Sequence, residues 1–203
     1  MAGRAVAWAA GVVLEEAVAL VVVAAALEAV AHQGGGRMNF ARILRHCFTS
    51  SMAVRRVFPD AVLIAIEQAI SRTEVSHDGE ILFAVEAALN TWPLLRDQSA
   101  RERAVEAFAQ LRVWDTEHNN GVLIYLLLAD RDVEIVADRG INSKVGSGEW
   151  EKICHEMEEA FRLGQFESGV IAGIQGIGNH LQTHFPAERK GGENELSDRP
   201  VIL

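Results

Sequence analysis

Polar residues in three short stretches flank the most apolar segments of this chain, and their types suit binding chemistry. The stretches are HDGE at 77–80, DTEHNNG at 115–121 and DRG at 138–140. Carboxylate and amide oxygens are the ligands that Ca²⁺ and Mg²⁺ take in proteins. A guanidinium group is a fixed fork of donors that suits phosphate or carboxylate. Such chemistry depends on whether the fold brings the three stretches together.

The apolar runs beside these stretches predict three buried strands: Glu80 to about Glu86, Gly121 to Ala129, and Val133 to Ala137. The first is apolar on both faces, as in a sheet that helices cover on both sides. Ser99 and Glu102 have capping-box spacing and open a helix between the first two strands. A strand–helix–strand unit predicts a parallel pair with a right-handed crossover. Asp130 and Asp132 indicate a hairpin turn, so the third strand runs antiparallel to the second.

Helical periodicity accounts for most of the remaining chain. Pro59 can open a helix at its first turn, and an apolar stripe over 62–70 follows it. Two further helical stripes run over 150–161, up to the stop at Gly164, and over 166–185. The elements predict an α/β fold, a three-layer sandwich in which helices cover a small mixed sheet of about three strands. One βαβ crossover plus a hairpin connects those strands.

This topology brings the three polar stretches to one edge of the sheet. The amino ends of two parallel strands and the carboxyl end of an antiparallel third lie together, and we call this edge the rim. Its polar residues are Asp78, Glu80, Asp115, His118, Asn119, Asn120, Asp138 and Arg139. We predict Asp78, Glu80, Asn120 and Asp138 as ligands of Ca²⁺ or Mg²⁺, and Arg139 as an anion-binding residue. The alternative is that Asn-Gly and Asp-Gly type turns gather at a sheet edge without binding anything.

Residues 37–58 predict a basic amphipathic helix without any acidic residue. One interpretation is a peripheral contact of residues 37–56 with an anionic membrane. The other is a helix docked on the main domain, with its arginines paired to carboxylates of that domain. We expect docking, because Phe40, Ile43 and Phe48 need an apolar environment.

The ends of the chain differ in composition from the domain at 59–186. Residues 1–36 form an apolar extension that Glu15, Glu16 and Glu28 interrupt, so it lacks the charge-free length of a spanning helix. It is a weak membrane anchor, an ordinary apolar helix, or an over-extended start with translation beginning at Met38, and we favour the last. Residues 187–203 are polar and predict a disordered tail.

Charge and cysteine content narrow the classes of function. The net charge of −9 argues against a nucleic-acid surface that covers the domain. The two cysteines, Cys47 and Cys154, have no metal-like spacing and are interpreted as free thiols in a reducing compartment or as small buried apolar residues. These features favour a cytoplasmic protein, with membrane association through the N-terminal region as the alternative.

The sequence around the rim resembles that of the TPM domain family. The match rests on NNG at 119–121 followed by VLIYLLLA, a short polar hairpin, and the exit VADRGI. It continues in FRLGQFESG at 161–169 and covers about residues 60–186. The resemblance implies an α/β sandwich and, as in some members, bound divalent cations and acid-phosphatase activity. Other members look like non-catalytic modulators of membrane protein complexes, which implies a binding role instead. The chain departs from the family in having FPDAV at 58–62 in place of an Asn-Asp motif.

Two functions agree with these observations. The first is a protein-binding module, an assembly or quality-control factor with a divalent cation at the rim. The second is a metal-assisted acid phosphatase that acts on phosphomonoesters, in which the cation polarises a phosphoryl oxygen. The partner is then a protein in the first case and a phosphorylated small molecule in the second. The sequence assigns no catalytic residue, because no nucleophile with an adjacent base is recognisable.

Overall fold

The computed structural model describes residues 40–187 and 194–203. The expectations for the extension at 1–36, for Arg37 and for a start at Met38 therefore fall outside the described residues. None of the helices in the described part of the chain is long and apolar enough to cross a membrane.

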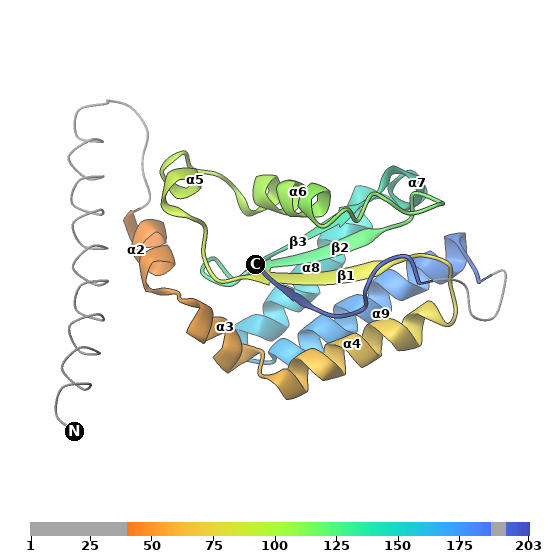
Figure 1. Ribbon diagram of the computed structural model, residues 1–203, viewed down its shortest axis with the longest axis horizontal. Helices are drawn as coiled ribbons and strands as arrows, with labels where there is room; N and C mark the ends of the chain where they lie inside the picture. The colour runs from red at the N-terminus through yellow and green to blue at the C-terminus, as the bar shows by residue number, and fades with distance from the viewer. Residues whose placement is uncertain (1–39, 188–193) are drawn as a thin grey trace, which may run out of the picture.

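A four-stranded mixed sheet with the order β3-β2-β1-β4 forms the centre of the domain (Figure 1). The strands are β1 (Ile81–Glu86), β2 (Val122–Leu127), β3 (Asp132–Ala137) and β4 (Val201–Ile202). β1 and β2 are parallel, and β2 and β3 form the antiparallel hairpin. The expected three strands, the crossover and the hairpin are thus confirmed.

The fourth strand corrects the expectation of a disordered tail at 187–203. Residues 194–203 are ordered against the domain, and β4 pairs in parallel with Ala84 and Val85 of β1. Val201 packs on the core beneath α6, so even this short apolar stretch is buried in part. A strand of two residues has no recognisable period, and for this reason the sequence did not predict it.

Eight helices surround the sheet in the described residues. They are α2 (Phe40–Phe48), α3 (Ser51–Val57), α4 (Asp60–Glu74), α5 (Thr91–Leu95), α6 (Ala100–Gln110), α7 (Arg139–Asn142), α8 (Ser147–Arg162) and α9 (Phe166–His184). Their ends follow local sequence signals. Pro59 is the N-cap of α4, the capping box of Ser99 and Glu102 begins α6, and Gly164 takes φ +77° between α8 and α9.

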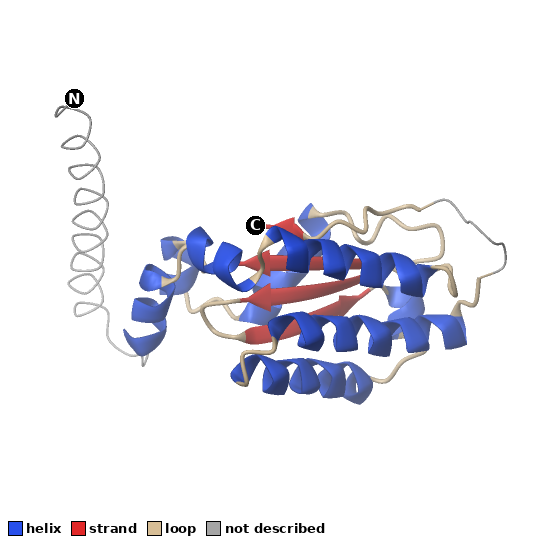
Figure 2. Ribbon diagram, turned by 90° about the horizontal axis from the view of Figure 1, so that it is seen from below, coloured by secondary structure: helices blue, strands red, loops and turns tan. Residues whose placement is uncertain are grey.

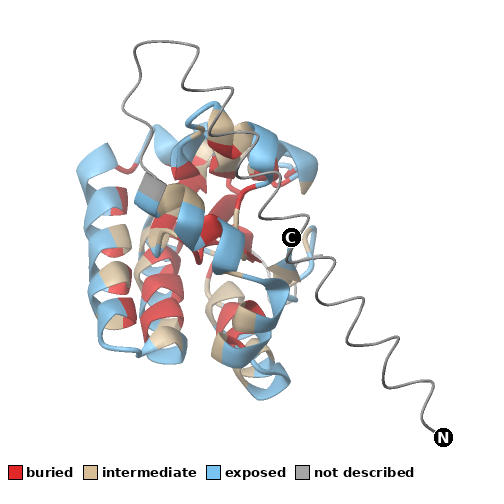
Figure 3. Ribbon diagram, turned by 90° about the vertical axis from the view of Figure 1, so that its left-hand side faces the viewer, coloured by how far each residue is buried: buried red, intermediate tan, exposed pale blue. Residues whose placement is uncertain are grey.

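The sheet separates two apolar cores and so produces three layers. Figure 2 shows α4, α8 and α9 over one face, and Figure 1 shows α5 and α6 over the other. Side chains of β1 alternate between the layers: Phe83 joins the core beneath α4, α8 and α9, whereas Leu82 and Ala84 join the core beneath α6. The helices are buried where they face the sheet and exposed on the other side (Figure 3). The expected three-layer α/β sandwich is confirmed.

The basic segment at 37–58 forms two helices in its described part, which corrects the expectation of one. α2 ends at Phe48, and Thr49 and Ser50 separate it from α3. The hydroxyl of Thr49 donates to the carbonyl of Arg45, and Ser50 is extended as the N-cap of α3. Hydroxyl side chains that bond to nearby backbone groups compete with helix continuation, which explains the break.

Candidate functional site

The rim lies at the end of the sheet that bears α7, opposite the end that bears α2 and α3 (Figure 1). Backbone bonds fasten its loops together. The amide of Asp138 donates to the carbonyl of Gly121 over 2.9 Å, and the amide of Gly140 donates to the carbonyl of Asn119 over 2.9 Å. The Nε of Arg139 donates to the Asn119 side-chain oxygen at 3.0 Å. The structure thus brings the NNG and DRG stretches together.

Two local features make this close approach feasible. Asn119 takes φ 52°, a left-handed conformation that asparagine tolerates better than most residues. A Cβ atom on Gly140 would lie 2.5 Å from the carbonyl oxygen of Asn119 and 2.6 Å from that of His118. Only glycine therefore allows the first turn of α7 to rest on the loop before β2.

Asn120 joins the third stretch to the other two. Its side-chain amide donates to the backbone carbonyl of Asp78 over 2.8 Å, which ties the start of β2 to the loop before β1. Its backbone amide donates to the hydroxyl of Thr116 over 3.1 Å. Asn120 is fully buried, and its Oδ1 has no hydrogen-bond donor among the described residues.

Asp138 is the N-cap of α7 and presents a second acceptor of this kind. Its Oδ1 accepts the Arg139 amide at 2.6 Å. Its Oδ2 is shielded from solvent and has no hydrogen-bond donor in the described part of the chain. Two oxygen atoms of the rim therefore lack a hydrogen-bond donor among the described residues, and both belong to predicted ligands.

Glu80, another predicted ligand, binds the C-terminal segment of the chain. Its carboxylate accepts the backbone amides of Glu195 at 3.1 Å and Leu196 at 3.3 Å, so it holds the C-terminal segment beside β1. Burial raises the pKa of Glu80, against the lowering effect of these two amide donors. Its oxygens are thus occupied by the chain itself.

Glu74 is a titratable residue of this region that the sequence did not single out. It lies at the end of α4, and its Oε1 accepts the Ile81 amide at 3.1 Å. Burial raises the pKa of Glu74 to about 8, and the nearby carboxylates of Glu80 and Asp198 add to the increase. A negatively charged side chain in the last turn of a helix interacts unfavourably with the helix dipole. The position of Glu74 in the sequence could have singled it out for this reason.

The remaining rim residues are exposed. Asp115 forms an ion pair with Arg112 at 2.6 Å, and His118 lies on the surface of the same loop. Within the described residues, no group of three or more His, Cys, Asp or Glu side chains is arranged to hold a metal ion. A cation at the rim would therefore need amide and backbone oxygens as well as carboxylates.

A second polar cluster lies at the opposite end of the sheet, and the sequence did not predict it. The carboxylate of Asp130 accepts Arg42 Nε at 2.9 Å and Arg45 Nη2 at 3.0 Å, and His46 Nε2 lies 3.1 Å from it. The Nδ1 of His46 accepts the Leu89 amide at 2.9 Å, so the ring proton lies on Nε2 and faces Asp130. We call these four residues, Asp130, Arg42, Arg45 and His46, the Asp130 cluster.

The Asp130 cluster tests the docking expectation for the basic segment. Pairing of its arginines with a carboxylate of the domain is confirmed for Arg42 and Arg45. Ile43 packs against the core beneath α6 as expected. The expectation is wrong for Phe48, which is 82% exposed, because α2 ends there and the chain turns away into α3.

The chain is similar to known proteins. A profile of the TPM domain matches residues 54–180. The BA42 protein of the psychrophilic bacterium Bizionia argentinensis, solved by NMR, is similar at 29% identity and a TM-score of 0.62 over 70% of this chain and 93% of that chain. The N-terminal domain of a P. gingivalis protein is also similar, at 20% identity and a TM-score of 0.47 over 62% of this chain and 76% of that one. No curated protein matches. Because the matched segment spans more than half of the chain and contains β1, β2, β3 and the rim, this chain belongs to the TPM domain family.

Proposed function

We propose that the chain is a binding module whose rim takes a divalent cation, and that it acts on a protein partner as an assembly or quality-control factor. The supporting observation is the pair of shielded oxygens without donors, Asn120 Oδ1 and Asp138 Oδ2. A buried acceptor without a donor costs free energy, on the order of 1–3 kcal/mol. A bound cation would remove that cost, since it is the counterpart that such oxygens lack.

The donor set favours Ca²⁺ over Mg²⁺. Asn120 would supply a neutral oxygen, Asp138 a carboxylate oxygen, and Asp78 a further carboxylate on the neighbouring loop. Ca²⁺ accepts such mixed sets of carboxylate, amide and backbone oxygens in flexible geometry, whereas Mg²⁺ demands a near-octahedral one. Glu80 would join only by giving up the amides of Glu195 and Leu196.

The rim residues also favour a binding role over catalysis. Asp115 is committed to Arg112, and Asp138 caps α7. His118 makes no side-chain hydrogen bond within the described residues that would orient it as a base. An activated nucleophile needs a base within hydrogen-bond reach and a third group to orient that base.

Thermal melting in the presence of Ca²⁺ or Mg²⁺ tests the cation proposal. Ligand at 100 times its dissociation constant stabilises the folded state by about 2.7 kcal/mol, so the melting temperature of the wild-type chain rises. Asp138→Asn keeps the Oδ1 cap and removes the charge, and we expect it to abolish most of the shift. Asp115→Asn, an exposed rim residue, is the matched control and keeps the shift. No shift at millimolar metal, or equal shifts in both variants, refutes the site.

The second candidate function is a metal-assisted acid phosphatase, and Arg139 favours it. Its Nε is held by Asn119, and the group has no ion-pair partner in the described part of the chain. A fixed guanidinium beside a cation suits a phosphoryl group. Hydrolysis of p-nitrophenyl phosphate at acidic pH decides between the candidates. It is measured on unheated portions of the metal-containing samples prepared for melting. Cation-dependent turnover that Arg139→Gln abolishes would establish the enzyme, and metal binding without turnover supports the binding module.

A further inference from the structure

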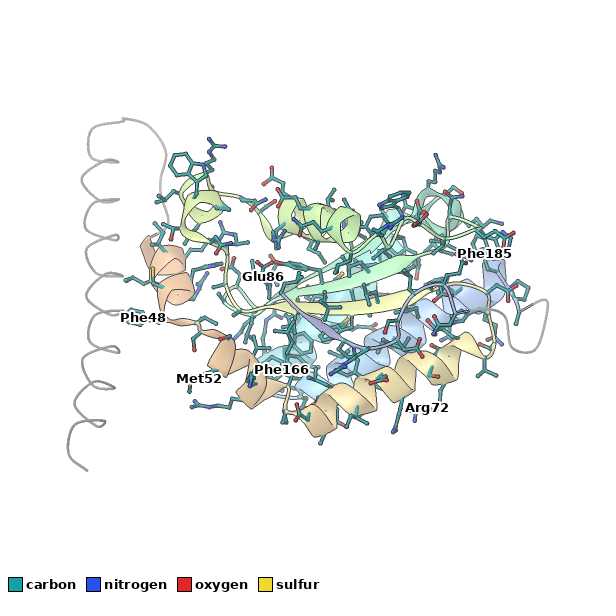
Figure 4. The ribbon with its side chains drawn as sticks, viewed as in Figure 1. Phe48, Met52, Arg72, Glu86, Phe166 and Phe185 are labelled. Atoms are coloured by element: carbon teal, nitrogen blue, oxygen red, sulfur yellow. The ribbon has the colours of Figure 1, made fainter. Side chains whose placement is uncertain are left out.

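The end of the domain formed by α2 and α3 exposes large apolar side chains next to two arginines that have no ion-pair partner among the described residues. Phe48 is 82% exposed, Met52 73% and Leu44 49%. Arg55 and Arg56 follow on α3, and both are exposed. Figure 4 shows Phe48 and Met52 at this end of the molecule, far from Phe185 at the rim end. We call these five residues, Leu44, Phe48, Met52, Arg55 and Arg56, the α2–α3 surface.

Neither helix needs these side chains for its attachment to the domain. His46 of α2 is buried against Asp130 and the Leu89 amide, and Val54 of α3 is fully buried in the core. Phe58, directly after α3, packs on Phe83 of β1 with ring centroids 5.6 Å apart. Each helix is therefore anchored by one side and presents the other to the outside.

The charge of the α2–α3 surface is opposite to that of the protein. The chain carries a net charge of −9, yet residues 40–58 contain no Asp or Glu. Arg55 and Arg56 have no ion-pair partner in the described part of the chain, unlike Arg42 and Arg45, which both pair with Asp130. The surface therefore complements an occupant that is anionic and offers apolar contact.

We propose that the α2–α3 surface docks on an anionic lipid bilayer. Phe48 and Met52 enter the boundary between headgroups and acyl chains, and Arg55 and Arg56 bind the headgroups. The rim lies at the opposite end of the sheet, so a docked domain would hold the rim away from the bilayer (Figure 1). The proposal is independent of the function proposed for the rim.

Cys47 provides a local reporter for the test. It is exposed and adjacent to Phe48, whereas burial raises the pKa of the Cys154 thiol to about 12 and slows its labelling. The full chain carries an environment-sensitive dye on Cys47 and is mixed with vesicles of phosphatidylcholine, with or without phosphatidylglycerol. We expect a blue shift of the dye emission with anionic vesicles only, reversed by salt.

Two paired variants assign the contact to the α2–α3 surface. Arg55→Gln with Arg56→Gln should weaken binding to anionic vesicles by about 30-fold, since each arginine near such a surface contributes about fivefold. Phe48→Ser with Met52→Ser should remove the blue shift. All four side chains are exposed, so the melting temperature should stay unchanged.

The matched controls place equivalent changes elsewhere on the surface. Arg72→Gln on α4 (Figure 4), combined with Arg162→Gln on α8, removes two exposed cations and should leave binding intact. A dye on Ile64→Cys, with Cys47 replaced by alanine, reports a site that is 53% exposed on α4 and should not shift. Equal shifts at both sites, or shifts that survive both paired variants, overturn the proposal. A dye on Cys47 that is already shielded without vesicles overturns it too, because the chain or a second copy then covers the surface.

Discussion

The Asp130 cluster predicts that one carboxylate decides whether α2 stays attached to the domain. The Asp130 side chain is only 11% exposed and receives Arg42, Arg45 and His46. Burial alone would raise the pKa of Asp130, but the hydrogen bonds from His46, Arg42 and Arg45 outweigh it and hold this pKa below its usual range. The ionised carboxylate is therefore stabilised by the fold. Its replacement by asparagine leaves three donors facing a neutral amide.

The expected loss of unfolding free energy depends on which hydrogen-bond acceptors the three donors keep after the substitution. Arg45 is 53% exposed and regains water, and Arg42 keeps the Gln98 carbonyl at 2.7 Å. The Nε2 of His46, at 1% side-chain exposure, loses its charged acceptor without access to water. Removing one partner of a buried pair costs about 3–5 kcal/mol, and hydrogen bonds to charged groups contribute about 1.5–3 kcal/mol each. We expect Asp130→Asn to lower the free energy of unfolding by about 2–3 kcal/mol.

Urea unfolding at pH 7 measures this loss, and hydrogen exchange locates it in α2. Asp97→Asn is the matched control, because Asp97 contacts the same Arg42 guanidinium at 3.1 Å but is 87% exposed. An exposed pair contributes about 0–1 kcal/mol, so this control should stay near the wild type. The folded pKa of Asp130 is depressed, so its contribution is present above the unfolded pKa and disappears as the pH falls through the folded value. Equal effects of the two substitutions, or unchanged exchange in α2, would refute the reasoning.

Three further perturbations test the rim and the helices. Gly140→Ala places a Cβ 2.5 Å from the carbonyl of Asn119 and should cost about 1–3 kcal/mol in urea unfolding, whereas Gly148→Ala meets nothing within 4 Å and should not destabilise. The pKa of Glu74 is raised to about 8, so its penalty is absent below its unfolded value and grows as the pH rises towards 8. Glu74→Gln should therefore melt like the wild type at pH 4 and higher than the wild type at pH 8. Ser99→Ala removes the capping box of α6 and should cost about 1 kcal/mol by the same urea assay.

Most of the sheet and four of the main helices, α4, α6, α8 and α9, could be predicted because their signals are local. The apolar runs of β1 and β2, the capping box at Ser99 and the stop at Gly164 act within a few residues. The convergence at the rim followed from the parallel pairing of the first two strands and the antiparallel hairpin, and contacts between Asn119, Arg139 and Gly140 agree with it.

The features that the sequence did not predict depend on contacts between residues far apart in the sequence. The partners of Asp130, Arg45 and Arg42, lie 85 and 88 residues away in the sequence. The sequence therefore could not predict that this turn residue contacts the basic helix. Glu80 looked like a free ligand because its true partners, the Glu195 and Leu196 amides, belong to a segment that composition classed as a tail. Cation binding at the rim stays a prediction, and Asn120 and Asp138 are the residues on which it depends.

The pairing of β1 with Val201 and Ile202 makes one sheet edge the last part of the domain to be completed during synthesis. β1, β2 and β3 leave the ribosome long before β4, so the outer edge of β1 stays unpaired in the nascent chain. Unpaired strand edges are templates for association with other chains, and incomplete domains are prone to aggregate. The bonds of Glu80 to the Glu195 and Leu196 amides then hold the arriving segment alongside β1. We expect nascent chains halted before residue 194 to bind chaperones that released chains no longer need.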